Sequence, residues 1–153
     1  MPLSKAARAF VMSLVLGALP AQTPAPLPEM TVYKTKTCGC CGKWVEHMRT
    51  AGFKVTVNDV PSTAEYRQKA GVPDRLQSCH TALVGGYAIE GHIPAADILR
   101  LLKEKPQVKG IAVPGMPMGS PGMEGPRSDP YDVWAFQADG TATPFQHHSG
   151  DGK

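Results

Sequence analysis

Three cysteines stand within four residues of one another, at Cys38, Cys40 and Cys41. The remaining cysteine, Cys79, is followed directly by His80. Packing three thiols so closely has no structural use that a small apolar side chain would not serve. Soft sulfur ligands crowded together either bind a soft metal or exchange electrons as a disulfide. We therefore expect the rest of the chain to hold this cluster in place.

Three kinds of site are compatible with this pattern. Cys38 and Cys41 have the C-x-x-C spacing of a thioredoxin-type redox pair, but such a pair gives no role to Cys40 and Cys79. Structural zinc sites usually use paired C-x₂-C motifs, which Cys-Gly-Cys-Cys is not. Thiolate clusters with supporting thioethers suit Cu(I) best among the biological metals. The pattern thus favours copper, with dithiol exchange and structural zinc as the alternatives.

A glycine- and proline-rich stretch runs from residue 110 to residue 125. We expect it to be a loop, because this composition cannot form a helix or a central strand. Methionine often fills gaps in a core, but a loop of this kind has little core to fill. The thioether side chains of this stretch are therefore predicted metal ligands: Met116, Met118 and Met123.

The histidines differ in how closely the sequence ties them to the cysteines. His80 adjoins the fourth cysteine and is predicted to ligate the metal or to support a ligand. His92 is equally compatible with ligation and with packing. His47, on the predicted cysteine-bearing helix, is expected to be a surface or packing residue. His147 and His148 form a pair near the C-terminus that would bind metal only weakly.

Residues 1–21 have the pattern of an export signal. Lys5 and Arg8 precede an uncharged apolar run over residues 9–19, which is shorter than the ~20 residues of a membrane-spanning helix. We expect cleavage before Gln22, and a disordered lead-in over residues 22–29, which are rich in proline.

Charge gives little reason to expect a polyanionic partner. Removal of residues 1–21 leaves 14 of the 16 basic residues against 13 acidic ones, a net charge of about +1. This balance argues against nucleic acid or an anionic membrane as the main partner of the mature chain. Its length fits one domain, which we expect over residues 30–146, with a flexible tail over residues 147–153.

Periodicity and turn signals predict an α/β protein whose elements follow the order β-α-β-α-β-β-α. The alternation of apolar and polar residues, capping patterns and glycine or proline stops place these elements at residues 30–34, 41–51, 53–57, 62–71, 80–84, 87–90 and 94–106. A second hairpin is expected at residues 131–136 and 141–145.

This is the element order of the thioredoxin and glutaredoxin core. In that fold the reactive cysteines follow the first strand and begin the first helix, and the residue that enters the third strand lies opposite them. Cys79 occupies that entry, so it is predicted to complete a four-sulfur site. Thioredoxins usually have a cis-proline there, which this chain lacks.

Four motifs together resemble the CopG-type copper-resistance proteins, formerly known as a bacterial domain of unknown function. They are Cys-Gly-Cys-Cys-Gly-Lys-Trp at 38–44, Ser-Cys-His-Thr at 78–81, Tyr-Ala-Ile-Glu-Gly-His-Ile-Pro-Ala at 87–95, and the methionine-containing loop at 113–125. The resemblance spans residues 30 to about 136. It implies a thioredoxin-like fold, a periplasmic location and a multinuclear copper cluster bridged by the four cysteines.

On this basis we expect an exported, single-domain protein that holds several Cu(I) ions for copper resistance or sequestration, with a role in copper redox handling as an extension. Its expected partners are copper ions and periplasmic proteins that donate or accept them, with no nucleic acid and no membrane after cleavage. The alternative function, from another class, is a thiol-disulfide oxidoreductase of the thioredoxin type.

Overall fold

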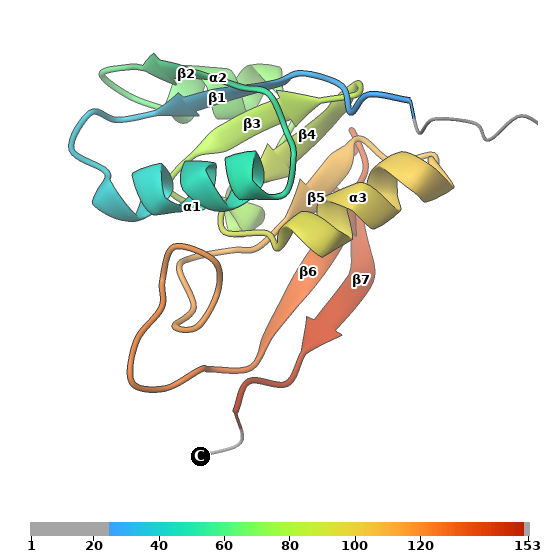
Figure 1. The fold of residues 1–153 in the computed structure, drawn as a ribbon. Coiled ribbons are helices and arrows are strands. Elements are labelled where there is room, and N and C mark those ends of the chain that lie inside the picture. Colours follow the sequence, from blue (N-terminus) through green and yellow to red (C-terminus); the bar gives the residue numbers. More distant parts are fainter. Residues whose placement is uncertain (1–24, 152–153) are drawn as a thin grey trace, which may run out of the picture.

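A seven-stranded mixed sheet forms the framework of the molecule (Figure 1). The computed structural model describes residues 25–151; the predicted export signal lies outside these residues. The strands are β1 (Met30–Lys34), β2 (Val55–Asp59), β3 (Thr81–Val84), β4 (Tyr87–Glu90), β5 (Gly110–Ala112), β6 (Tyr131–Phe136) and β7 (Ala142–His148). The helices are α1 (Gly39–Thr50), α2 (Ala64–Lys69), α3 (Ala95–Glu104) and a 3₁₀ turn, η1 (Asp74–Leu76). This confirms the predicted α/β class and the predicted order of the first seven elements.

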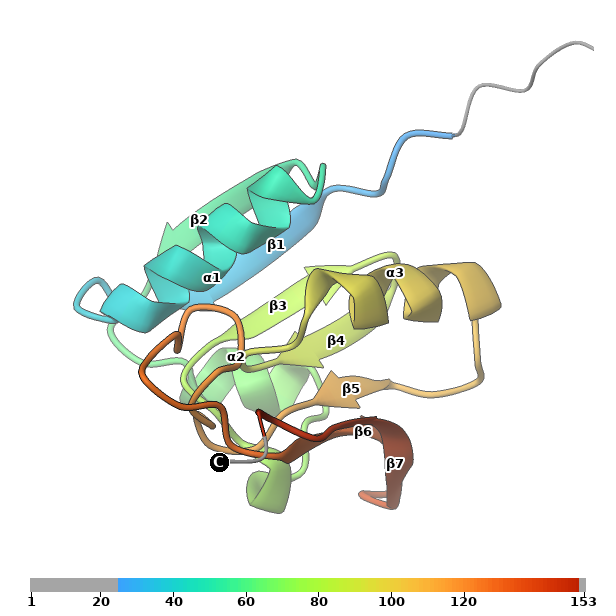
Figure 2. The same ribbon diagram turned by 60° about the horizontal axis from the view of Figure 1, so that its bottom comes forward.

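The strand order across the sheet is β2-β1-β3-β4-β5-β6-β7. Strand β1 pairs with β2 in parallel and with β3 antiparallel, and β4 pairs with β5 in parallel. The other neighbours are antiparallel. Helices α1 and α3 cover one face of the sheet and α2 lies on the other (Figure 2). The larger core cluster lies under α1 and α3, and a smaller one lies beside α2 and η1.

The β3–β4 hairpin forms as predicted. Its two-residue turn, Gly85-Gly86, has φ values of 56° and 86°, and a type I′ turn needs positive φ at both positions. The turn fixes the register, so that Val84 pairs with Tyr87 and Thr81 with Glu90. The entry to β3 and the exit from β4 therefore lie side by side.

Helix α1 begins two residues earlier than predicted. Cys38 is the N-cap with an extended backbone, and its carbonyl oxygen accepts a hydrogen bond from the N–H of Gly42. Cys40 therefore lies in the first helical turn with Cys41 and not in the preceding loop, as had been expected. The buried face of the helix carries Trp44 among its largest side chains.

Two further boundaries differ from the sequence prediction. Strand β2 begins at Val55, because Phe53 still belongs to the helix exit and donates its N–H to the carbonyl of Met48. Helix α2 begins at Ala64, two residues later than predicted. Of the expected capping box only one bond forms, in which the Ala64 N–H donates to Ser62 Oγ at 3.2 Å, while Thr63 Oγ1 accepts a hydrogen bond from Arg67.

The prediction of an unbroken loop over residues 110–125 is wrong at its start. Gly110–Ala112 is β5, an interior strand of the sheet between β4 and β6. A Cβ atom at Gly110 would lie 2.1 Å from the carbonyl oxygen of Ala88. Glycine is therefore needed here for the close approach of two strands, and does not mark a loop.

The chain also stays ordered beyond the predicted start of the tail. Strand β7 continues through His148. His147 Nδ1 lies 2.7 Å from Asp132 Oδ1, and His148 Nε2 lies 2.7 Å from Asp97 Oδ2. These contacts hold both histidines in the second hairpin, away from the cysteines. Within residues 25–151, no helix has both the length and the apolar character needed to cross a membrane.

Candidate metal centre

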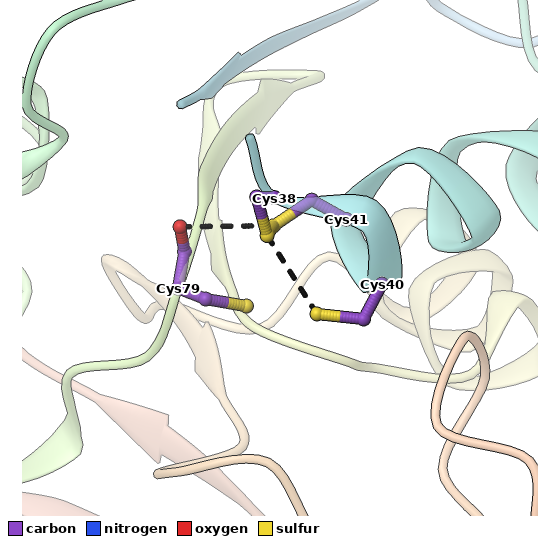
Figure 3. A group of neighbouring side chains, drawn as sticks. All are labelled: Cys38, Cys40, Cys41 and Cys79. Atoms are coloured by element: carbon purple, nitrogen blue, oxygen red, sulfur yellow. Dashed lines mark hydrogen bonds between the residues drawn. A yellow bond between two sulfur atoms is a disulfide. The ribbon is translucent and has the colours of Figure 1, made fainter. Parts of the chain in front are cut away.

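Four cysteine sulfurs come together at the N-terminus of α1 (Figure 3). Cys38, Cys40 and Cys41 come from the turn that starts the helix, and Cys79 comes from the segment that enters β3. All four sulfur atoms lie within 4.8 Å of one another. The structure thus brings together residues that are about 40 positions apart in the sequence.

Two of the four cysteines form a disulfide bond in this structure. Cys38 is bonded to Cys41, and Cys40 and Cys79 are free thiols. Cys40 Sγ lies 3.6 Å from Cys38 Sγ, and Cys41 Sγ lies 3.8 Å from the carbonyl oxygen of Cys79. Figure 3 shows the Cys79 side chain directed toward Cys40. The structure is therefore an oxidised form in which two thiols remain next to the disulfide.

Two histidines extend the sulfur cluster on the Cys79 side. Cys79 Sγ lies 3.0 Å from His92 Nε2 and 3.4 Å from His80 Nδ1. Candidate ligand atoms of Cys79, His80 and His92 all lie within 4.8 Å of one another. Cys79 consequently belongs both to the four-sulfur group and to a Cys-His-His group.

The orientation of His92 allows its Nε2 atom to accept a hydrogen bond or to ligate a metal ion. Its Nδ1 donates a hydrogen bond to the carbonyl oxygen of Pro121, at 2.8 Å. A hydrogen bond of this kind fixes the tautomer of a ligating histidine and leaves the other nitrogen free of its proton. In the metal-free protein, Nε2 of His92 accepts a hydrogen bond from the Cys79 thiol.

His80 is buried beside the cluster. Its ring lies 4.4 Å from the ring of Trp44 and 5.1 Å from that of His92, centroid to centroid. Burial, together with the neighbouring His92, lowers the pKa of His80 to about 3. Among the described residues, its Nε2 atom is buried without a hydrogen-bond partner. His80 is thus a neutral imidazole, the form that can ligate a metal.

Burial shifts the pKa of Cys79 in the opposite direction. It raises the pKa of this thiol to about 11, and the nearby Cys40 adds to the shift. The metal-free protein therefore holds Cys79 as a neutral thiol at neutral pH. A metal that binds its sulfur must displace the proton, because the thiolate is the ligand.

The methionine loop crosses the start of α1. Met116 Sδ lies 4.0 Å from Cys40 Sγ, and half of its side chain is exposed. A Cβ atom at Gly122 would lie 2.6 Å from the carbonyl oxygen of Cys40, so only glycine allows this approach. Glu124 accepts hydrogen bonds from His47 Nε2, at 2.6 Å, and from the Gly122 N–H, at 2.7 Å. The loop is thereby fastened to the helix next to the cysteines.

The other two methionines lie farther along this loop. The terminal methyl of Met118 packs against Gly125, and Met123 is half-buried with its backbone paired to Ser120 and Gly119. Within residues 25–151, Met116 alone of the three predicted thioethers accepts a hydrogen bond from a cysteine thiol.

His92 is the residue that the sequence reasoning did not include among the predicted ligands. The signal that would have found it is the hairpin register. Continuing the Thr81–Glu90 pairing outward by two residues places Cys79 opposite His92. The backbone supports this continuation, since the Gly91 N–H donates to the carbonyl of His80.

Fold and site together define an α/β protein with a sulfur-rich cysteine and histidine centre able to hold metal. Two solved structures match it, named "Copper resistance protein copG- Form 1" and "Form 2". Each is 42% identical, covers 81% of this chain and 99% of its own, and superposes with a TM-score of 0.76. The chain belongs to the CopG copper-resistance protein family.

Part of the chain also matches a family of unknown function. Residues 76–123 match the family model described as "Protein of unknown function, DUF411". That stretch contains Cys79, both site histidines and the three loop methionines. No curated protein matches the chain.

Proposed function

We propose that this protein is an exported copper-binding protein of copper resistance, and that its reduced form holds several Cu(I) ions in a cluster of thiolates. One observation carries the proposal: four cysteine sulfurs from two separate segments lie within 4.8 Å of one another, and two histidines adjoin the fourth. Thiolates select soft metals, and Cu(I) is the softest of the common candidates. The related structures are named as copper resistance proteins.

The arrangement of the cysteines supports a multinuclear cluster. Cys40 and Cys41 are successive residues in the first turn of α1, and successive helical side chains point about 100° apart. They could therefore hold different metal atoms, and the thiolates of Cys38 and Cys79 would complete the sulfur ligands around them. The predicted zinc alternative has less support, because its tetrahedral sites are built from separate Cys-x₂-Cys pairs.

We propose a ligand set that combines these cysteines with neighbouring residues. His80 and His92 are neutral imidazoles beside Cys79, and Met116 is the thioether beside Cys40. Met118 and Met123 belong to the same loop, and we propose that they support its closure over the cluster. The half-exposed Met116 is the outermost of these donors and suits the entry of copper.

Reduction must precede complete loading of the site. The Cys38–Cys41 disulfide gains two electrons and two protons from a dithiol reductant, which itself becomes a disulfide. Each of the four resulting thiols then loses a proton as it binds copper. Coupling between thiol oxidation and copper release would give the protein a role in copper redox handling.

We propose a thioredoxin-like core and a periplasmic location for this protein. The element order and the β2-β1-β3-β4 strand order support a thioredoxin-like core, extended here by β5, β6 and β7. We propose that residues 1–21 direct export and are removed, and that the mature domain exchanges copper with donor and acceptor proteins in the periplasm.

The Cys38–Cys41 disulfide favours one second candidate, a thiol-disulfide oxidoreductase acting on proteins. Its C-x-x-C spacing and its position at the start of α1 are those of a catalytic dithiol. This candidate does not use Cys79, whose pKa is raised by burial, or the two histidines beside it.

Metal analysis tests the proposed function. The protein is purified anaerobically from the periplasm of copper-grown cells, and its copper and zinc contents per chain are measured. We expect more than one copper per chain and no stoichiometric zinc. One zinc per chain, or a metal-free protein that reduces disulfides with robust turnover, would favour one of the alternatives.

A further inference from the structure

We propose that Arg67 and Glu90 form a clamp that positions Cys79 for metal binding. This inference rests on the proposed function for its role, and on a network of contacts outside the cluster for its structure. The clamp joins α2, on one face of the sheet, to the segment that carries the fourth cysteine beside α1, on the other face (Figure 2).

The Cys79 segment needs such a clamp because of where it lies. Three of the cysteines occupy the N-cap and the first turn of α1, so the start of the helix sets their spacing. Cys79 comes from irregular chain between η1 and β3. Its distance to the other sulfurs therefore depends on what fixes its two neighbours: His80, whose carbonyl accepts from the Gly91 N–H, and Ser78.

Glu90 and Arg67 hold both backbone groups of Ser78. The Ser78 N–H donates to Glu90 Oε1, at 2.7 Å, and the Ser78 carbonyl accepts from Arg67 Nη2, at 2.8 Å. Arg67 Nε also donates to Glu90 Oε1, at 2.8 Å, which closes the clamp. Glu90 is fully buried and only 13% of the Arg67 side chain is exposed.

The remaining contacts keep the clamp rigid. Thr81 Oγ1 donates to Glu90 Oε2, at 2.6 Å. Arg67 Nη1 donates to Gln77 Oε1, at 3.1 Å, and Nη2 donates to Thr63 Oγ1, at 3.0 Å. The planar guanidinium with several donors fits this arrangement, which a lysine ammonium cannot reproduce.

The clamp also reaches the methionine loop through Ser78. Ser78 Oγ donates to the carbonyl oxygen of Gly115, at 2.5 Å, and the Gly115 N–H donates to the carbonyl of Gln77. Gly115 directly precedes Met116. One residue, Ser78, therefore links the position of the fourth cysteine to the base of the loop that brings the thioether to the cluster.

A buried ion pair is weak evidence for a contribution to stability, because desolvation offsets much of its attraction. The contacts of this pair instead converge on the residue next to a proposed ligand. Outer groups that orient metal ligands typically change metal affinity by about 10- to 100-fold when they are removed. We infer that Arg67 and Glu90 act in this way, as positioning residues.

The test uses Arg67→Lys and Glu90→Gln in the full mature protein, with Lys69→Met as the matched control. Lys69 lies on the same helix and forms an exposed ion pair with Glu65. Cu(I) affinity of the reduced proteins is measured by competition with a chelator. We expect a loss of about 10- to 100-fold in both clamp variants and no change in the control.

A second readout does not depend on copper. In an oxidised Cys40→Ser background, the disulfide leaves Cys79 as the single free thiol. Its rate of alkylation by iodoacetamide, measured well below the melting temperature, should rise several-fold in both clamp variants and stay unchanged with Lys69→Met. If the wild type binds no copper, the proposed function fails while this readout still tests the clamp.

A lowered melting temperature with unchanged Cys79 alkylation and unchanged copper affinity would overturn the inference and leave an ordinary structural ion pair. Should either variant fail to fold, amide hydrogen exchange of the wild type decides. The Ser78 amide, which donates to Glu90, is expected to be as protected as the amides of β3. A rapidly exchanging Ser78 amide would contradict the clamp.

Discussion

Cys79 Sγ and His92 Nε2 lie 3.0 Å apart, in line with the pairing of the β3–β4 hairpin. The contact joins the sulfur cluster at the start of α1 to a second group built on the hairpin. Because His92 also donates to the carbonyl of Pro121, the same imidazole touches the loop that carries Met116. Helix, hairpin and loop therefore meet at one cysteine.

Replacing His92 should weaken copper binding. We expect His92→Gln to lower Cu(I) affinity about tenfold, through loss of the Nε2 donor beside Cys79. His147→Gln is the matched control, since His147 is an exposed histidine that pairs with Asp132 in the second hairpin, away from the cysteines. Competition with a Cu(I) chelator measures both. Equal affinities of His92→Gln and the wild type would remove His92 from the ligand set.

The three methionines should not contribute equally. Met116→Leu keeps most of the bulk and removes the thioether that lies 4.0 Å from Cys40 Sγ. Transfer of Cu(I) from a weak donor should become slower in this variant, with little change in melting temperature. Met118→Leu and Met123→Leu are predicted to have smaller effects, and stopped-flow transfer measurements compare the three. If Met116→Leu transfers copper at the wild-type rate, its thioether is not the point of entry.

Buried His80 should make the metal-free, oxidised protein sensitive to acid. The unfolded residue takes up a proton near its ordinary pKa of 6.5, whereas the folded residue stays neutral until about pH 3. The stability due to neutral His80 is therefore complete above pH 6.5 and is lost as the pH falls toward 3. Denaturant unfolding between pH 7 and pH 4 measures it.

Comparison with His80→Gln isolates this contribution. The decrease of unfolding free energy with falling pH should be less steep in the variant, by up to one proton. Identical slopes for the two proteins would mean that folded His80 takes up its proton at the same pH as the unfolded residue.

Replacing Cys40 distinguishes a dithiol enzyme from a protein that holds a metal cluster. A dithiol mechanism needs one attacking and one resolving sulfur, which Cys38 and Cys41 would supply. On our account, Cys40→Ser cripples copper binding, and copper loading of the wild type silences thiol reactivity because coordinated thiolates cannot attack. Insulin reduction by metal-free protein should be weak. Robust turnover that survives the loss of Cys40 or Cys79 would favour the oxidoreductase.

Much of the fold could be predicted because local signals agreed with it. The apolar alternation of β1, the glycine turn of the first hairpin and the proline stops of α3 are all short-range patterns. The order of these elements matches the thioredoxin core, and that match predicted that Cys79, although remote in sequence, would enter β3 near the other cysteines.

The features that could not be predicted depend on contacts between distant segments. Gly110 resembles a loop residue in sequence, and only the close approach of the Ala88 carbonyl explains why it occupies an interior strand. The Arg67–Glu90 pair produces no recognisable sequence pattern, because the two residues lie on different elements. His92 was equally compatible with two roles until the hairpin register was extended beyond the last strand pair.

The most direct test of the central claim is the number of Cu(I) ions bound per reduced chain, in the wild type and in Cys79→Ser. Reduced metal-free protein is titrated anaerobically with Cu(I) in the presence of a competing chelator, and secondary structure is followed by circular dichroism. We expect the wild type to bind more than one ion per chain and Cys79→Ser to lose multinuclear binding with its fold intact, because Cys79 closes the site from the opposite side. A folded Cys79→Ser protein that binds the wild-type number of copper ions would contradict the four-sulfur cluster.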